Sequence, residues 1–268
     1  MRARKQVLLV LGAAVTVATA VLAPVVSASV SASDAVPADI PPGYYDAAAG
    51  KTGPELHAAL HGIVGTGAHL TYDEVWEALK VTDEDPANPA NVVMIYSGAS
   101  MSEDANGGGA DQWNREHTWA QSHGDFGTSP GPGTDLHHLR PSEVGVNSTR
   151  GNLDFDNGGE ELADAPGNFV DEDSFEPRDA VKGDVARGIL YMAVRYDGED
   201  GFADLEPNDA VDNGSAPFMG RLSVLLAWHT QDPPDAAEQT RNDTIYADYQ
   251  NNRNPFVDHP EWASSIWG

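Results

Sequence analysis

The sequence contains no cysteine, so no disulfide bond stabilises the protein, a composition that is permissible outside the cell. Basic residues are also few, since 15 Lys and Arg stand against 42 Asp and Glu, for a formal net charge of -27. A protein that binds nucleic acid is expected to present a basic surface, so this balance argues against that class. Net charge, however, determines solubility and encounter rate and not the chemistry of a site.

Nucleotide-binding motifs and internal repeats are missing as well. The chain has no Walker loop and no Gly-x-Gly-x-x-Gly segment followed by a helix, so a nucleotide cofactor is not indicated. With 268 residues and 40% hydrophobic residues, the chain can bury a full core as one domain.

Only the N-terminus is apolar enough to approach the length of a membrane span. Basic residues precede an apolar run over 7–26, and a small-residue site follows at 26–28, which is the anatomy of a secretory signal peptide. We therefore predict a signal peptide over 1–28, a flexible leader over 29–40 and one catalytic domain over 41–268. The protein is then secreted, either extracellular or periplasmic, and keeps no stable membrane association after cleavage. A retained membrane anchor is the alternative.

Three polar segments, at 114–117, 134–139 and 146–152, carry the candidate chemistry. Together they supply a general base, oxygen ligands for a hard cation and cationic groups that could meet a phosphate. These are the components of metal-assisted phosphodiester hydrolysis. Glu116 and His117 are adjacent, so in an extended segment their side chains point to opposite faces, and one can hold a metal while the other addresses a water.

The residues between these segments predict their local structure. Glycine and proline recur between 124 and 133, which indicates a loop between two short extended segments. Asn147 and Arg150 lie three residues apart, a spacing that places them on one face of a helix. The predicted order is therefore a strand, a loop, a second strand and a helix.

Hydrophobic spacing elsewhere predicts several amphipathic helices. Pro54 suits the first turn of a helix over 54–64, and Thr71 with Glu74 forms a capping-box pattern for the next. Further helices are predicted over 181–196 and 218–229, and from Asp235 to a stop near Pro255, with a buried strand over 92–96. The predicted fold class is α+β, with helices around a small mixed sheet.

The ordered motifs resemble the endonuclease I family of secreted and periplasmic nucleases, whose active site is a ββα-metal, or His-Me finger, motif. The matching segments are Arg115-Glu116-His117, Asp135-Leu136-His137-His138-Leu139, and Val146-Asn147 with Arg150 and Asn152. Similarity extends upstream through 44–46 and 75–79 and downstream through 182–187 and 253–261, and so covers nearly the whole mature chain.

The resemblance implies a role for each matched residue. His117 would be the general base that activates the attacking water, and Glu116 and Asn147 would be the protein ligands of one divalent cation. Mg²⁺ is the expected ion because it prefers oxygen ligands and retains several waters, with Mn²⁺ or Ca²⁺ as alternatives. Members of the family cleave DNA, and many also RNA, leaving 5′-phosphates. Nucleic acid is thus the expected partner of a monomeric enzyme.

The chain departs from the family pattern at one point. Some relatives place a phosphate-contacting arginine in a long, cysteine-containing insertion after the Glu-His pair, whereas the corresponding loop here is short and has no arginine. Arg150 and Arg140 are the candidates that replace it. A structural role, in which Arg150 braces the helix, is the competing interpretation.

Two other function classes remain open from the sequence. A non-catalytic secreted acidic protein could bind Ca²⁺ through its acidic loops, and the nuclease could use the same loops for an additional structural Ca²⁺. The oxygen donors concerned, all acidic except Asn157, are Asp154, Asp156, Asn157, Glu160, Glu161, Asp171, Glu172, Asp173, Asp197, Glu199, Asp200 and Asp204. A zinc hydrolase would draw on His117, His123, His137 or His138, although no His-Glu-x-x-His segment is present. His137 and His138 alternate in direction if extended, so one of them is expected to face the core.

Overall fold

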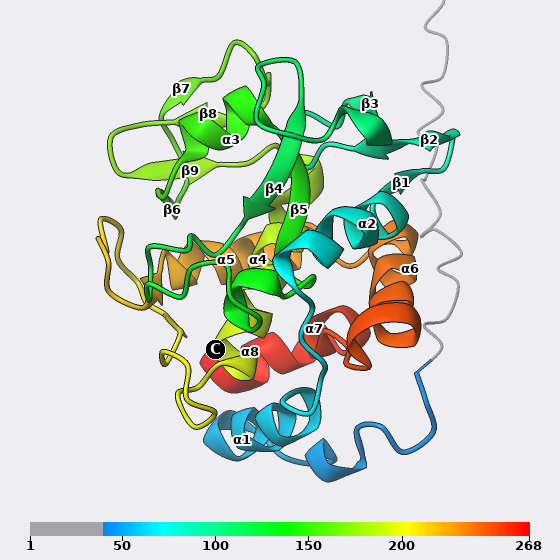
Figure 1. The fold of residues 1–268 in the computed structure, drawn as a ribbon. Helices are drawn as coiled ribbons and strands as arrows, with labels where there is room; N and C mark the ends of the chain where they lie inside the picture. Colours follow the sequence, from blue (N-terminus) through cyan, green and yellow to red (C-terminus); the bar gives the residue numbers. More distant parts are fainter. Residues whose placement is uncertain (1–39) are drawn as a thin grey trace, which may run out of the picture. The chain divides into compact units, whose positions relative to one another are not determined.

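The computed structural model describes residues 40–268 (Figure 1). The predicted signal peptide over 1–28, and the leader over 29–40 apart from Ile40, lie outside the described residues. Among residues 40–268, no helix combines the length and the apolar character that crossing a membrane requires.

Helices form the frame of the described chain. They are α1 (Gly53–Val64), α2 (Tyr72–Thr82), α3 (Val144–Arg150), α4 (Lys182–Arg195), α5 (Leu222–Gln231), α6 (Ala236–Thr244), α7 (Pro255–Asp258) and α8 (Glu261–Trp267). A π-helical turn over Ile245–Gln250 continues α6.

The strands are short and form four small sheets within the described residues. Their bounds are β1 (Glu84–Asp85), β2 (Asn88–Val93), β3 (Ser100–Ser102), β4 (Trp113–His117), β5 (Leu139–Glu143), β6 (Asp154–Phe155), β7 (Glu160–Glu161), β8 (Phe169–Val170), β9 (Ser174–Glu176), β10 (Glu206–Pro207) and β11 (Phe218–Met219). The sheet orders are β1-β2-β3, β4-β5, β6-β9-β8-β7 and β10-β11. The α+β class is confirmed, but the single small mixed sheet is wrong, because the strands pair in four separate groups with no pairing between the groups in the described chain.

The main core is built around α4, which packs against α1, α5 and α7. Its residues are buried from Val185 to Arg195, including the apolar positions whose spacing predicted this helix. Arg187 is fully buried inside the same helix, where its guanidinium donates to both carboxylate oxygens of Glu238 at 2.7 and 2.5 Å. Because the Arg187 charge is paired with Glu238, α4 can be buried around this residue without leaving an uncompensated charge.

Local signals for helix starts are confirmed. Pro54 lies in the first turn of α1. Thr71 and Glu74 form the capping box of α2, in which the Thr71 amide donates to Glu74 Oε2 at 2.7 Å and the Glu74 amide donates to Thr71 Oγ1 at 3.3 Å. Asp235 caps α6 by accepting from the Glu238 amide at 2.9 Å. These signals succeed because both partners lie within four residues of each other.

Three boundaries predicted from hydrophobic runs are wrong. The strand expected over 92–96 ends at Val93, because the chain turns there and the Gly98 amide donates to Met94 O at 2.8 Å. Phe218 lies in β11, paired in parallel with β10, and not in the helix that begins at Leu222. Pro255 opens the short helix α7 after the π-helical turn. Burial alone does not distinguish a strand from a turn or a helix.

The segment that carries the motifs follows the predicted order. β4 pairs antiparallel with β5, from Trp113 opposite Glu143 to His117 opposite Leu139, and α3 begins directly after β5. Figure 1 shows β4 and β5 lying side by side. The hairpin and its helix therefore bring the three polar segments together.

Candidate active site

A cleft of about 480 Å³ opens at the end of the β4–β5 hairpin. Glu116 and His117 from β4 and Asn147 from α3 all line it, so the structure brings together the base and the two metal ligands that the motifs predict. Glu116 and His117 share this cleft even though successive side chains of a strand alternate in direction. Tyr72 and Arg115, which the sequence analysis did not select, line it too.

His117 ends β4 and retains 8% exposure. Its Nε2 lies 3.0 Å from the carbonyl oxygen of Gly133 and 2.9 Å from the side-chain amide of Gln121. The Gly133 carbonyl can only accept a hydrogen bond, so Nε2 must carry the proton. With its amide rotated by half a turn, Gln121 presents its oxygen to Nε2 and accepts from the same N–H. Nδ1 then keeps its lone pair.

The protonation of His117 follows from its surroundings. Burial, reinforced by the nearby His138 ring, lowers the pKa of His117 to about 3. The imidazole is therefore neutral at physiological pH and able to accept a proton. Gly133 itself has no room for a side chain, because a Cβ there would lie 2.0 Å from Gly127 O. This close loop packing is what presents the Gly133 carbonyl to the ring.

Glu116 is buried, with 1% exposure, and its Oε1 accepts a hydrogen bond from the Tyr96 hydroxyl at 2.6 Å. Arg150 Nη1 lies 3.5 Å from the same oxygen. Burial raises the pKa of Glu116, and the charge of Arg150 and the Tyr96 hydrogen bond oppose that rise. A cation beside this carboxylate would favour its ionised form in the same way.

Asn147 and Glu116 each keep an oxygen available to a cation. Asn147 Nδ2 donates to Asn114 Oδ1 at 2.8 Å, which orients the amide. Within residues 40–268, no group hydrogen-bonds to Asn147 Oδ1 or to Glu116 Oε2. One carboxylate and one amide oxygen suit Mg²⁺, which binds few protein ligands and keeps waters. The residues present therefore fit the ion that the motifs imply.

Arg150 and Arg140 do not line the cleft. Arg150 has 1% exposure and donates to the backbone oxygens of His117 at 3.0 Å and Thr118 at 2.6 Å, so it braces the end of β4. Arg140 is held by Asp83, 2.8 Å from its Nε, and by Asp184, 3.3 Å from its Nη1. The structure thus brings neither arginine to a position where it faces a phosphate in the cleft.

Arg115 belongs to the matched motif, but the sequence analysis did not choose it as the arginine that contacts the phosphate. The carbon at the centre of its guanidinium lies 3.3 Å from the ring centroid of Tyr72 and 4.0 Å from that of Trp76, and Nη1 donates to the Tyr72 carbonyl. Its place beside Glu116 in the motif was a signal. The aromatic contacts were not visible, because they come from α2, far earlier in the sequence.

The histidines of the zinc alternative do not converge. His123 Nδ1 lies 2.7 Å from Phe218 O, His138 Nε2 lies 2.7 Å from Pro132 O, and His137 Nε2 lies near Asn252. Each ring is thus held by a partner of its own. His137 and His138 are both buried, so both face the interior and not one alone.

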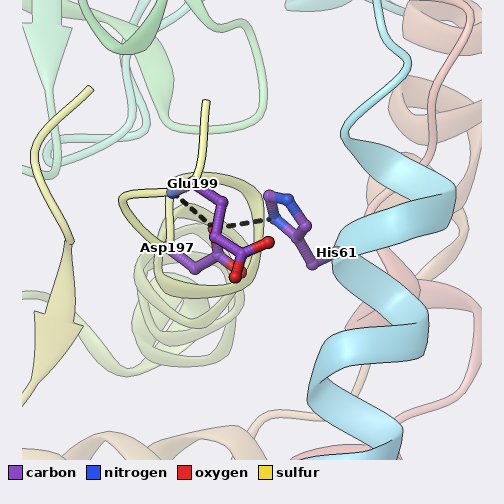
Figure 2. Close-up of side chains that lie close together, drawn as sticks. All are labelled: His61, Asp197 and Glu199. Atoms are coloured by element: carbon purple, nitrogen blue, oxygen red, sulfur yellow. Dashed lines mark hydrogen bonds and ion pairs between the residues drawn. The ribbon is translucent and has the colours of Figure 1, made fainter. Parts of the chain in front are cut away.

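Two of the acidic residues considered for Ca²⁺, Asp197 and Glu199, lie together with His61 (Figure 2). Across the described chain, this is the one group of three His or acidic side chains close enough to share an ion. His61 Nδ1, however, lies 3.0 Å from Val194 O and 3.3 Å from Asp197 Oδ1. A hydrogen bond that this nitrogen donates to Val194 O already links α1 to the end of α4.

Comparisons with known proteins agree with the geometry of the cleft. The sequence profile described as Endonuclease I matches residues 52–261. The chain is 62% identical over 224 residues to an extracellular ribonuclease of Bacillus amyloliquefaciens, covering 84% of this chain and 78% of that protein. It is 63% identical over 224 residues to an extracellular ribonuclease of Bacillus subtilis (strain 168), with the same coverage. The chain therefore belongs to the endonuclease I family and is a nuclease that hydrolyses phosphodiester bonds.

Proposed function

We propose that the cleft hydrolyses phosphodiester bonds in RNA, and also in DNA, by the attack of a water molecule that His117 deprotonates. The observation that carries this proposal is that His117 lines the same cleft as Glu116 and Asn147, with its Nε2 3.0 Å from the Gly133 carbonyl oxygen. A proton shared with that carbonyl leaves Nδ1 as the ring nitrogen that can accept a proton from water. The water oxygen bonds to phosphorus, the bond to the 3′ oxygen breaks, and the product retains a 5′-phosphate.

Glu116 and Asn147 would hold one divalent cation, Mg²⁺ in the first instance, with Mn²⁺ or Ca²⁺ as alternatives. When bound, the ion supplies positive charge that stabilises the pentacovalent phosphate and the departing oxygen. The β4–loop–β5–α3 segment then corresponds to the ββα-metal, or His-Me finger, motif. Specific support for the ligand pair is that both residues line the cleft and that each has an oxygen free of hydrogen bonds within the described chain.

The surrounding groups keep the base in one tautomer. The Gly133 carbonyl accepts from Nε2 and favours the charge that the imidazole gains when Nδ1 takes the proton. Arg150 fixes the backbone at His117 and Thr118, so the ring is held where the strand ends. Both contacts act through the position of His117 and not on the substrate.

RNA takes first place among the substrates, whereas the sequence alone had put DNA first. The two relatives are named extracellular ribonucleases. Their names also agree with the secretion that the N-terminal sequence predicts for this chain. Because water is the nucleophile, the ribose 2′-hydroxyl is not needed, and the same site can cleave DNA.

We expect the purified protein to cleave an RNA oligonucleotide and its version with a single 2′-deoxyribose at the cleaved position at similar rates. The fragments should carry 5′-phosphates, and chelation by EDTA should abolish both reactions. Mass spectrometry of the termini provides the measurement. Fragments ending in 2′,3′-cyclic phosphates, or cleavage that survives EDTA, would contradict metal-assisted attack by water.

Glu116→Gln and Asn147→Ala should each raise the Mg²⁺ concentration needed for half-maximal activity by at least about tenfold. About tenfold is the smallest loss of metal affinity expected for residues that merely support a metal ligand, and these two are proposed as the ligands themselves. Each change removes or weakens an oxygen ligand of the same ion. Magnesium titrations of initial rate provide the measurement, with calorimetry for direct binding. The exposed Glu84→Gln is the matched control. Unchanged cation binding in both variants would place the metal elsewhere.

A further inference from the structure

The proposed reaction brings a negatively charged phosphate into the cleft, where a positive side chain would stabilise its binding. Among the described residues that line the cleft, Arg115 is the only Lys or Arg. Its guanidinium is thus the one protein cation of the cleft that a phosphate could meet.

Arg115 differs from its neighbours in how its charge is held. Arg140 forms ion pairs with Asp83 and Asp184, and Arg150 lies against Glu116. Within the part of the chain that the structure describes, Arg115 has no carboxylate at ion-pair distance. Asp73 acts on the Arg115 charge only from beyond ion-pair distance, so no direct salt bridge neutralises this charge beside the base.

The aromatic contacts hold this charge without neutralising it. The Tyr72 and Trp76 rings lie 3.3 and 4.0 Å from the guanidinium carbon, and Trp76 packs edge-on against Trp113 at 5.2 Å between centroids. Stacking uses the flat face of a guanidinium and leaves N–H groups at its edge for a phosphate. Arg115 Nη1 donates to the Tyr72 carbonyl, whereas Nε is buried and has no hydrogen bond within the described chain.

The same stack lies close to the base. The Tyr72 ring is 5.9 Å from the His117 ring, centroid to centroid, at an interplanar angle of 30°. A phosphate positioned for attack by a water on His117 would therefore lie within the region that Tyr72 and Arg115 border. From these contacts we infer that Arg115, stacked on Tyr72 and Trp76, binds a backbone phosphate of the substrate.

This inference rests on the proposed function, so its test measures binding and not cleavage. In a His117→Ala background, the affinity of a DNA oligonucleotide is compared with that of versions carrying one uncharged methylphosphonate at each position in turn. Arg115→Met removes the charge but keeps an unbranched apolar side chain between the two rings. Arg221→Met, at an arginine paired with Asp156 away from the cleft, is the control.

Arg115→Met should weaken binding of the unmodified oligonucleotide at least about tenfold, the lower range for a hydrogen bond to a charged group. Arg115→Met should cause no further loss when the methylphosphonate replaces the phosphate that Arg115 contacts. Removing either charge breaks the same interaction, so the two losses do not add. Arg115→Lys should recover part of the affinity. The Arg221→Met control should bind as the background does.

Equal losses at every methylphosphonate position, or no loss at all, would overturn the inference and leave Arg115 as a packing residue. Cleavage assays of the parent protein separate this result from a failure of the proposed function. If the parent cleaves RNA while no methylphosphonate position abolishes the effect of Arg115→Met, only the role of Arg115 is wrong. If one position abolishes that effect but the parent does not hydrolyse RNA or DNA, the role of Arg115 stands and the proposed reaction is wrong.

Discussion

Replacing His117 with alanine is expected to slow phosphodiester hydrolysis at least about a hundredfold, the lower range for a positioned general base. The reason is the state of the ring: Nε2 is engaged by Gly133 O, and the low pKa, about 3, keeps Nδ1 free of a proton at neutral pH. No other ring among the described histidines lines the cleft.

Initial rates on one RNA substrate at saturating Mg²⁺ measure this loss. His57→Ala, at a half-buried histidine of α1 outside the cleft, should retain the parent rate. Circular dichroism should show both variants folded. Added imidazole should restore part of the activity of His117→Ala, since it can enter the vacated space and accept the proton. A folded His117→Ala protein with near-parental cleavage would remove His117 from the mechanism.

Asp83→Asn is expected to lower the free energy of unfolding by about 3–5 kcal/mol, the range for breaking a buried ion pair from one side. Asp83 accepts from Arg241 Nε at 3.1 Å and Nη2 at 3.1 Å, and its Oδ1 lies 2.8 Å from Arg140 Nε. An amide cannot compensate either guanidinium, so the largely buried Arg241 would lose its carboxylate partner and Arg140 would keep only Asp184. The effect is large because water cannot take over their solvation.

The pH dependence of this stabilisation has a defined sign. Burial raises the pKa of Asp83, but Arg241 and Arg140 outweigh that effect, and the pKa lies below its usual value. The stabilisation is therefore complete above the unfolded-state pKa of about 3.9 and is lost as pH falls through the lower folded-state value.

Urea unfolding at several pH values is the measurement. Parent and Asp83→Asn should differ most at neutral pH, and the difference should shrink toward strong acid. Asp104→Asn, at an exposed position, should unfold with the parent at every pH. Coincident unfolding curves for parent and Asp83→Asn at neutral pH would show that the two arginines do not depend on this carboxylate.

The ion pairs of Asp83 also explain why Arg140, a candidate for phosphate contact, does not line the cleft. Its sequence position, between two motif segments, was compatible with the cleft. Its partners come from the end of α2 and from α4, which are remote in sequence from β5. Residue type and motif spacing cannot tell an arginine that faces the substrate from one that closes a buried ion-pair network.

The acidic composition pointed away from a nucleic-acid enzyme, yet the chain belongs to a nuclease family. Net charge sums over the whole surface, whereas the chemistry depends on a few groups within one cleft. In that cleft the balance of charge is different. Glu116 is buried against Tyr96 and Arg150. Arg115, which lines the cleft, has no acidic partner at ion-pair distance in the described chain. Local order in the motifs was therefore the better guide.

The sequence by itself determined the features that depend on near neighbours. These are the capped starts of α2 and α6, the buried helix α4, and the strand, loop, strand and helix that carry Glu116, His117 and Asn147. Only the tertiary structure decided the rest: the separation into small sheets, the bracing role of Arg150 and the stacking of Arg115 on Tyr72 and Trp76. The physical reason is that capping bonds and helical periodicity join residues within a turn or two, whereas ion pairs and ring stacking join segments that meet only after the chain has folded.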